Sequence, residues 1–139
     1  MLCVGVSLVA WGCRPEAAGP SAPTAPVDQP LSSIRRTILG RTPAHEAGWE
    51  TRLYLIEYPP GAVAPPHVHP VAGVGWVVEG ELESAFGDAP ATTAHRGQSF
   101  TDLADVPHRV FRNKDPDRPL RFVIAYTIRV GEENFHPLP

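Results

Sequence analysis

The chain is poor in cysteine and in lysine. Cys3 and Cys13 are its only cysteines, so no thiol remains after residue 13 for nucleophilic catalysis or for a paired-cysteine zinc motif. Lys114 is the only lysine among 12 basic residues, which stand against 15 acidic ones. Because no basic excess gathers in one region, the sequence argues against a nucleic-acid-binding surface.

Several familiar motifs are also missing. The sequence contains no internal repeat, no Gly-rich phosphate loop and no Gly-x-Ser-x-Gly nucleophile elbow. No segment has the periodicity of a long amphipathic helix. With 139 residues, of which 42% are hydrophobic, the chain can build one core and one domain. These absences leave a single domain of short strands as the main expectation.

The first 13 residues differ from the rest. MLCVGVSLVAWGC carries no charged side chain and is too short for a membrane span, which takes about 20 residues, so it predicts a signal peptide. Its end, Ala10-Trp11-Gly12-Cys13, resembles a bacterial lipoprotein processing site, which implies a lipid anchor at Cys13. Residues 14–30 contain five prolines and predict an extended linker. We expect an exported protein in the periplasm or cell envelope; the alternative is a disordered or mistranslated leader.

From Leu31 onward the sequence predicts short β-strands separated by turns. In residues 120–130 the large apolar side chains alternate with smaller and charged ones, as they do in a strand with one buried face. Trp76 and Phe86 are expected in the core, with stacking on a ligand in the cavity as the alternative. The pattern predicts an all-β sandwich or barrel over residues 31–139. The clearest strands are expected at 51–58, 74–79, 81–86 and 120–130.

Two histidines lie one residue apart in the stretch PPHVHP. Because strand side chains alternate, His67 and His69 project from the same face and Val68 from the other. A lone buried histidine is most often a hydrogen-bonded core residue, but a pair with this spacing is typical of metal ligands. The spacing therefore predicts that the two imidazoles are ligands of one metal.

Residues 34–135 resemble the small single-domain cupins. The first cupin motif is Gly, five residues, His-x-His, three or four residues, Glu, six residues and Gly. The chain matches every position of this spacing, except that glycine replaces the glutamate. The matching residues are Gly61, His67, His69, Gly73 in the Glu position, and Gly80.

The second cupin motif is matched in outline between Gly97 and Asn113, with Leu103 in place of its proline, and it contains His108. The resemblance implies a single jelly-roll barrel, also called a double-stranded β-helix, over residues 31–139. It also implies that His108 comes from a facing strand and completes a metal site with the two histidines of the first motif.

The resemblance to cupins implies a divalent metal bound by three histidines alone. Ferrous iron is the first expectation, with nickel, copper or zinc as alternatives, because neutral imidazoles suit these metals better than manganese. Asp102 precedes His108 and is the only residue that looks placed to replace the missing carboxylate. It is also the only candidate for an acid or base near the metal, so no catalytic residue is assigned.

Two functional classes follow. One is an oxygenase of the dioxygenase type, or less favourably an isomerase, acting on a small organic substrate. The alternative is a non-catalytic module that captures a metal or small ligand in the cell envelope. A purely structural barrel is the third reading. The resemblance further implies a homodimer formed through edge strands, and membrane contact is expected only through the anchor at Cys13.

Overall fold

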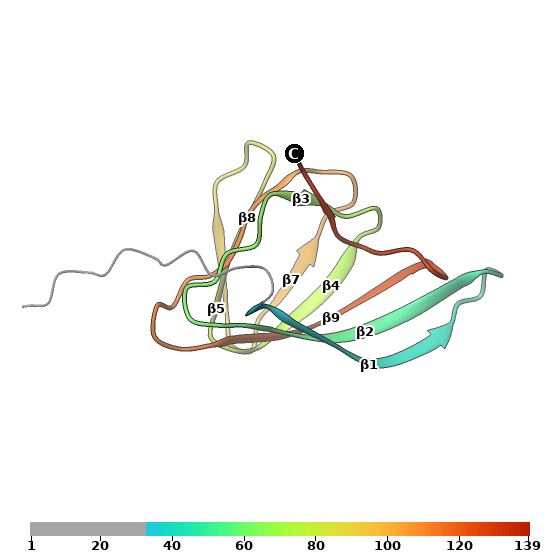
Figure 1. The fold of residues 1–139 in the computed structure, drawn as a ribbon, viewed down its shortest axis with the longest axis horizontal. Coiled ribbons are helices and arrows are strands. Elements are labelled where there is room, and N and C mark those ends of the chain that lie inside the picture. The colour runs from blue at the N-terminus through green and yellow to red at the C-terminus, as the bar shows by residue number, and fades with distance from the viewer. Residues whose placement is uncertain (1–32) are drawn as a thin grey trace, which may run out of the picture.

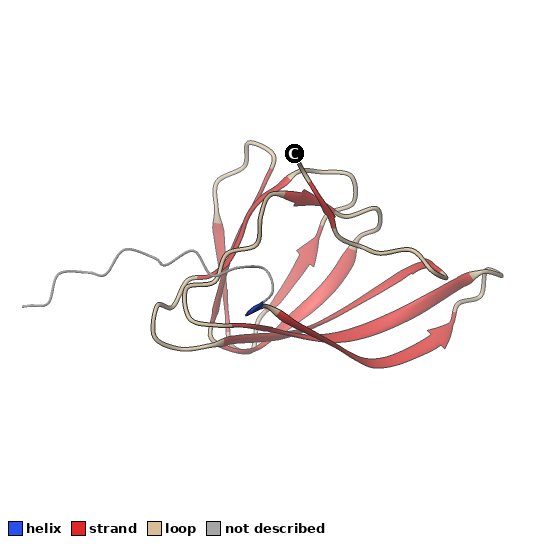
Figure 2. Ribbon diagram, viewed as in Figure 1, coloured by secondary structure: helices blue, strands red, loops and turns tan. Residues whose placement is uncertain are grey.

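The computed structural model describes residues 33–139, which form ten β-strands. Strands account for most of this part of the chain (Figure 2). The predicted leader, residues 1–13, and the predicted linker, residues 14–30, lie outside the described residues. Within residues 33–139 no helix is long and apolar enough to cross a membrane. The predicted all-β fold is confirmed.

The strands form two five-stranded antiparallel sheets, here called sheet A and sheet B, which Figure 1 shows as two layers around a common interior. In spatial order, sheet A contains β1 (Arg35–Pro43), β2 (Trp49–Tyr58), β9 (Leu120–Arg129), β4 (Gly73–Glu79) and β7 (Ser99–Asp102). Sheet B contains β10 (His136–Pro137), β3 (His67–Val68), β8 (His108–Asn113), β5 (Glu81–Phe86) and β6 (Thr92–His95).

The core lies between the two sheets. It contains aliphatic side chains from both sheets and a cluster of aromatic rings. The ring of Phe111, on β8, packs edge-on against those of Tyr58 and Phe122 at centroid distances of 5.7 and 5.5 Å. Such edge-to-face pairs add to the stabilisation from burial of the rings. The aliphatic residues with no exposed surface are Ala62, Val77, Leu82, Leu120 and Ile128.

The alternation predicted for residues 120–130 is confirmed in β9. Leu120, Phe122 and Ile124 are buried, whereas Arg121 and Arg129 are exposed. The periodicity identified the inward face correctly because only one face of this strand is apolar enough to be buried.

The prediction that Trp76 belongs to the core is wrong. In β4 the inward positions are Gly73, Gly75 and Val77, and the side chain of Trp76 is 50% exposed on the opposite face. A Cβ atom on Gly75 would lie 2.2 Å from the ring of Phe100, so that ring fills the space an inward side chain would take. Because both faces of this strand are apolar in sequence, the pattern does not show which face is buried. The packing of Phe100 over Gly75 determines it.

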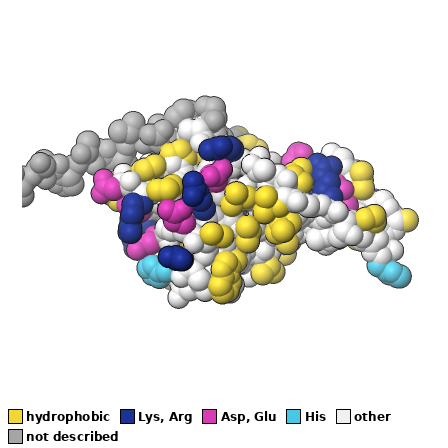
Figure 3. Space-filling model, turned by 90° about the horizontal axis from the view of Figure 1, so that it is seen from below, with side chains coloured by type: hydrophobic (Ala, Val, Ile, Leu, Met, Phe, Trp, Pro, Cys, Tyr) yellow, Lys and Arg dark blue, Asp and Glu magenta, His cyan; other side chains and the backbone are white. Residues whose placement is uncertain are grey.

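The outward face of sheet A is unusually apolar. Its exposed side chains include Val74, Trp76 and Val78 of β4 together with Leu53 of β2. Figure 3 views the molecule from the side of this sheet and shows hydrophobic side chains gathered there.

After β9 the chain turns back and crosses the β3 strand (Figure 1). Arg52 holds the turn: it is 3% exposed and donates a hydrogen bond of 2.7 Å to the carbonyl of Glu132. Beyond the turn, β10 pairs with β3, and the amide of Leu138 donates to the carbonyl of Pro66 at 2.9 Å. Residues 132–138, here called the C-terminal crossing, thus fix the segment that carries the His-x-His pair.

Candidate metal centre

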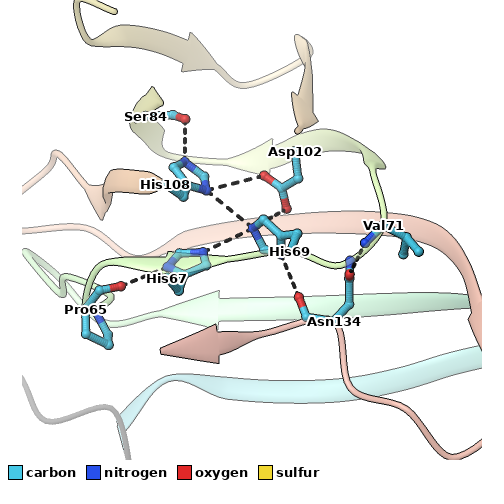
Figure 4. Close-up of polar contacts among 8 residues, drawn as sticks. All are labelled: Pro65, His67, His69, Val71, Ser84, Asp102, His108 and Asn134. Atoms are coloured by element: carbon cyan, nitrogen blue, oxygen red, sulfur yellow. Dashed lines mark hydrogen bonds and ion pairs between the residues drawn. The ribbon is translucent and has the colours of Figure 1, made fainter. Parts of the chain in front are cut away.

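The structure brings the three predicted histidines together. His67 lies in β3 directly opposite His108, the first residue of β8, and His69 follows one residue after β3 ends. The exposed fractions are 2% for His67, 6% for His69 and 0% for His108. One nitrogen of each ring faces the same point between the two sheets (Figure 4), and the three rings form a group that could hold a metal ion.

The distances among the inward nitrogens fit ligands of one metal. Nε2 of His67 lies 3.1 Å from Nε2 of His69, which lies 3.4 Å from Nδ1 of His108, and all three atoms are within 4.8 Å of one another. Atoms bound to one metal at about 2.1 Å lie roughly 3.0 to 3.4 Å apart in octahedral or tetrahedral arrangements. The arrangement matches this spacing closely for two of the pairs.

The outward nitrogens fix the orientation of all three rings. Nδ1 of His67 bonds to the carbonyl of Pro65 at 2.8 Å, and Nδ1 of His69 bonds to the carbonyl of Asn134 at 2.6 Å. Nε2 of His108 bonds to the hydroxyl of Ser84 at 2.7 Å. Outer partners of this kind are usual for metal-binding histidines, because they set both the ring orientation and the tautomer.

The carbonyl partners assign the tautomer of two rings. A carbonyl can only accept, so the Nδ1 atoms of His67 and His69 must carry protons, and in the neutral rings both Nε2 atoms are then unprotonated. Two unprotonated nitrogens 3.1 Å apart repel each other unless a cation lies between them. The donor set therefore fits a metal ion.

Burial keeps two of the rings neutral. It lowers the pKa of His67 to about 4 and that of His108 to about 3, because desolvation disfavours the charged imidazolium. Neighbouring histidines lower the pKa of His108 further. At neutral pH both rings thus offer the unprotonated nitrogen that a metal requires.

We expect the metal-free protein to lose stability in mild acid. Between pH 6.5 and 4, His67 and His108 bind protons in the unfolded chain but remain largely unprotonated in the folded one. The free energy of unfolding therefore falls as the pH falls. Burial raises the pKa of Asp102 to about 6, which opposes this effect below pH 6. The net loss between pH 6.5 and 4.5 should be roughly 3 kcal/mol, measured by urea unfolding in chelator.

The exposed His136 supplies the control for this pH experiment. The His136→Gln variant should follow the same stability profile as the unchanged chain. A stability that is constant or rises between pH 6.5 and 4.5 would contradict the assignment of neutral, buried imidazoles.

Aromatic rings enclose the imidazoles. Phe86 stacks on His108 with ring centroids 3.8 Å apart, and Phe135 lies against His67 at 4.3 Å. Phe86, which was expected in the core, therefore packs beside the site and is partly exposed. These rings keep water from the buried sides of the histidines.

Sequence reasoning missed the residues that hold the histidines in place. The sequence predicts a strand at 81–86 but does not indicate a role for Ser84 at the metal, and it indicates none for Asn134. Asn134 is 5% exposed, and its side-chain oxygen also accepts from the amide of Val71 at 3.1 Å. Its only sequence signal is a polar residue near the end of the chain, which does not indicate a partner 65 residues away.

A small cavity opens beside the histidines. Its wall includes the tyrosines Tyr54 and Tyr126, whose rings stack at 5.5 Å, together with the polar residues Arg36 and Asn134. The space that water can enter is about 40 Å³, enough for a few water molecules. Asp102 is the only carboxylate residue among the described residues that line it. The cavity thus admits only a small molecule without rearrangement.

Two antiparallel sheets that enclose converging, oriented imidazoles define a small jelly-roll protein with a candidate metal centre. The family comparison agrees, because the model of the cupin domain matches residues 54–126, which is more than half of the chain. The chain belongs to the cupin domain family. No curated protein matches its sequence.

Solved structures share the fold. The cupin-2 domain protein Rru_A2000 from Rhodospirillum rubrum has a TM-score of 0.58 at 18% identity, over 83% of this chain and 69% of that one. A double-stranded β-helix protein from Klebsiella pneumoniae has a TM-score of 0.56 at 22% identity, over 79% of this chain and 88% of that one. The DMSP lyase DddQ from Ruegeria pomeroyi has a TM-score of 0.58 at 20% identity over 74% of this chain, which spans about half (51%) of the lyase.

Proposed function

We propose that the protein binds a divalent metal, ferrous iron in the first place, through His67, His69 and His108, and acts as a dioxygenase-type enzyme on a small organic substrate. The observation that supports this most is the convergence of three buried imidazole nitrogens whose outer nitrogens are already held by hydrogen bonds. When bound, such a metal supplies Lewis acidity or oxygen chemistry at the barrel interior.

The protein's own residues would bind and orient the substrate. The cavity places the tyrosine pair beside His67 and His69, and Arg36 adds a positive charge to its lining. Burial raises the pKa of Tyr126 above its ordinary value, so its hydroxyl stays protonated and available as a donor. Aromatic walls exclude bulk water. The substrate is therefore expected to be small and to carry a polar group that accepts hydrogen bonds.

A non-catalytic binding module is the second proposal. It is supported by the shortage of acid and base groups, because Asp102 is the only carboxylate among the described residues lining the cavity. Oxygen uptake with thiols, diketones and flavonols distinguishes the two proposals. DMSP is tested as a further substrate, with its cleavage as the measured reaction, because one protein of similar fold is named as a DMSP lyase. Turnover of a substrate supports the enzyme, and saturable binding without turnover supports the module.

The metal content of the purified full chain tests both proposals. We expect close to one equivalent of iron, nickel, copper or zinc per chain, and none in the His67→Ala variant. Absence of metal from the unchanged chain, even after anaerobic loading with ferrous iron, would contradict the proposed function. The thermal midpoint in chelator must be similar for both chains, so that loss of metal is not loss of fold.

We also propose, from the sequence alone, that the domain is exported to the periplasm or cell envelope and held there by a lipid at Cys13. A homodimer through edge strands is part of the same proposal. Lipid labelling of Cys13 and sedimentation of the purified domain test these two points separately.

A further inference from the structure

Asp102 is a buried carboxylate that lies beside the three histidines. It ends β7, is 4% exposed, and points toward the inward nitrogens of His69 and His108 (Figure 4). Oδ2 lies 3.4 Å from Nε2 of His69, and Oδ1 lies 3.8 Å from Nδ1 of His108. Oδ1 has no hydrogen-bond partner within residues 33–139. A buried carboxylate oxygen without a partner is costly, so a ligand for it is to be expected.

These distances are longer than good hydrogen bonds, which join nitrogen and oxygen at about 2.7 to 3.2 Å. The 3.4 Å distance falls at the edge of the roughly 3.0 to 3.4 Å expected between neighbouring ligands of one metal, and the 3.8 Å distance is longer. The separation of the Asp102 carboxylate from His69 equals that between His69 and His108, 3.4 Å in both cases. The Asp102 carboxylate therefore lies beside the ligand atoms of two of the three histidines, His69 and His108.

The strand register explains how a carboxylate reaches this place. Asp102 is the direct antiparallel partner of Gly73 on β4, and side chains of directly opposed residues project from the same face of a sheet. Gly73 has no side chain to offer, and a Cβ atom there would lie 3.1 Å from Cδ1 of Ile124. The neighbouring strand thus supplies a carboxylate opposite position 73, where β4 has no side chain.

We propose that the Asp102 carboxylate is the fourth protein ligand of the metal, a proposal that rests on the proposed three-histidine site. The ligand set becomes three neutral imidazoles and one carboxylate. An anionic oxygen donor widens the range of metals, because carboxylates suit manganese whereas imidazoles alone favour later metals. Manganese, which the three-histidine reading disfavours, becomes a metal that this site accepts.

The test compares Mn(II) and Zn(II) affinities of the full chain with those of the Asp102→Asn variant. Loss of the ligand should weaken Mn(II) binding by about 100-fold, whereas Zn(II) should still bind through the histidines with a smaller loss. Asp105→Asn is the matched control, because it removes the same charge from an exposed residue three positions later. Its affinities should stay within about threefold of the unchanged chain.

Each outcome decides the proposal. Mn(II) affinity unchanged in Asp102→Asn would overturn it and leave Asp102 as a buried neighbour of His69 that does not bind the metal. Zn(II) binding by both chains would at the same time uphold the three-histidine site, so the two proposals can fail separately. No binding of either metal by the unchanged chain would overturn both.

A second measurement does not depend on the variant's folding. A crystal structure of the unchanged chain with Mn(II) should place an Asp102 oxygen at about 2.0 to 2.2 Å from the ion. An ion held by the histidines with both Asp102 oxygens beyond about 3 Å would overturn the proposal.

Discussion

Replacing His69 by glutamine is expected to weaken Zn(II) binding by about 100-fold or more. Affinities of structural zinc sites correspond to about 10 to 16 kcal/mol, so loss of one of three or four ligands removes roughly 3 kcal/mol. His69 is central, because its Nε2 lies within 3.4 Å of atoms of His67, His108 and Asp102. Competition with a chromophoric chelator measures the change directly.

The matched control for this experiment is His136→Gln. His136 is exposed and lies opposite Val68 in the pairing of β10 with β3, so it shares the region without facing the cavity. Its substitution should leave the Zn(II) affinity within about threefold. Equal weakening by both substitutions would show that the region, rather than the ligand, had been disturbed, and would contradict the role of His69.

The second large effect concerns stability. Gly80→Ala should destabilise the fold by roughly 3 kcal/mol or more, because the residue has a positive φ of 85° where the chain passes from β4 to β5. A Cβ atom there would lie 2.6 Å from the backbone carbonyl oxygen of Pro119, and that oxygen cannot move aside as a side chain can. Urea unfolding measures the change.

Gly97→Ala separates the two causes of this effect. Gly97 has a similar φ of 83°, but nothing lies within 4 Å of the position its Cβ would take. Its substitution should therefore cost only the backbone strain, about 1 to 2 kcal/mol. Equal losses in the two variants would show that backbone conformation, and not the contact with Pro119, limits position 80.

The sequence predicted the buried face of residues 120–130 and the shared face of His67 and His69 for different physical reasons, whereas the jelly-roll barrel and His108 followed from the resemblance to cupins. Alternation in residues 120–130 indicates a buried face, because only one side of that strand is apolar. The spacing of His67 and His69 places both imidazoles on one face whatever the neighbouring strands are. Both predictions depend on how side chains alternate along a single strand, and this alternation can be read from the sequence.

What the sequence could not predict depends on contacts between distant segments. Trp76 faces outward because Phe100 occupies the space over Gly75, and that packing is visible only after β4 and β7 are paired. Asn134 holds His69 across 65 residues. Asp102 could be named as the residue best placed to replace a carboxylate, but its register with Gly73 required the sheet.

The partners that orient the imidazoles differ in how easily evolution can remove them. His67 and His69 are held by the carbonyls of Pro65 and Asn134, and no substitution deletes a backbone carbonyl. His108 instead depends on the hydroxyl of Ser84, which one nucleotide change can eliminate. Neutral drift in this lineage should therefore preserve the orientation of the first two rings, while that of His108 persists only under selection at position 84.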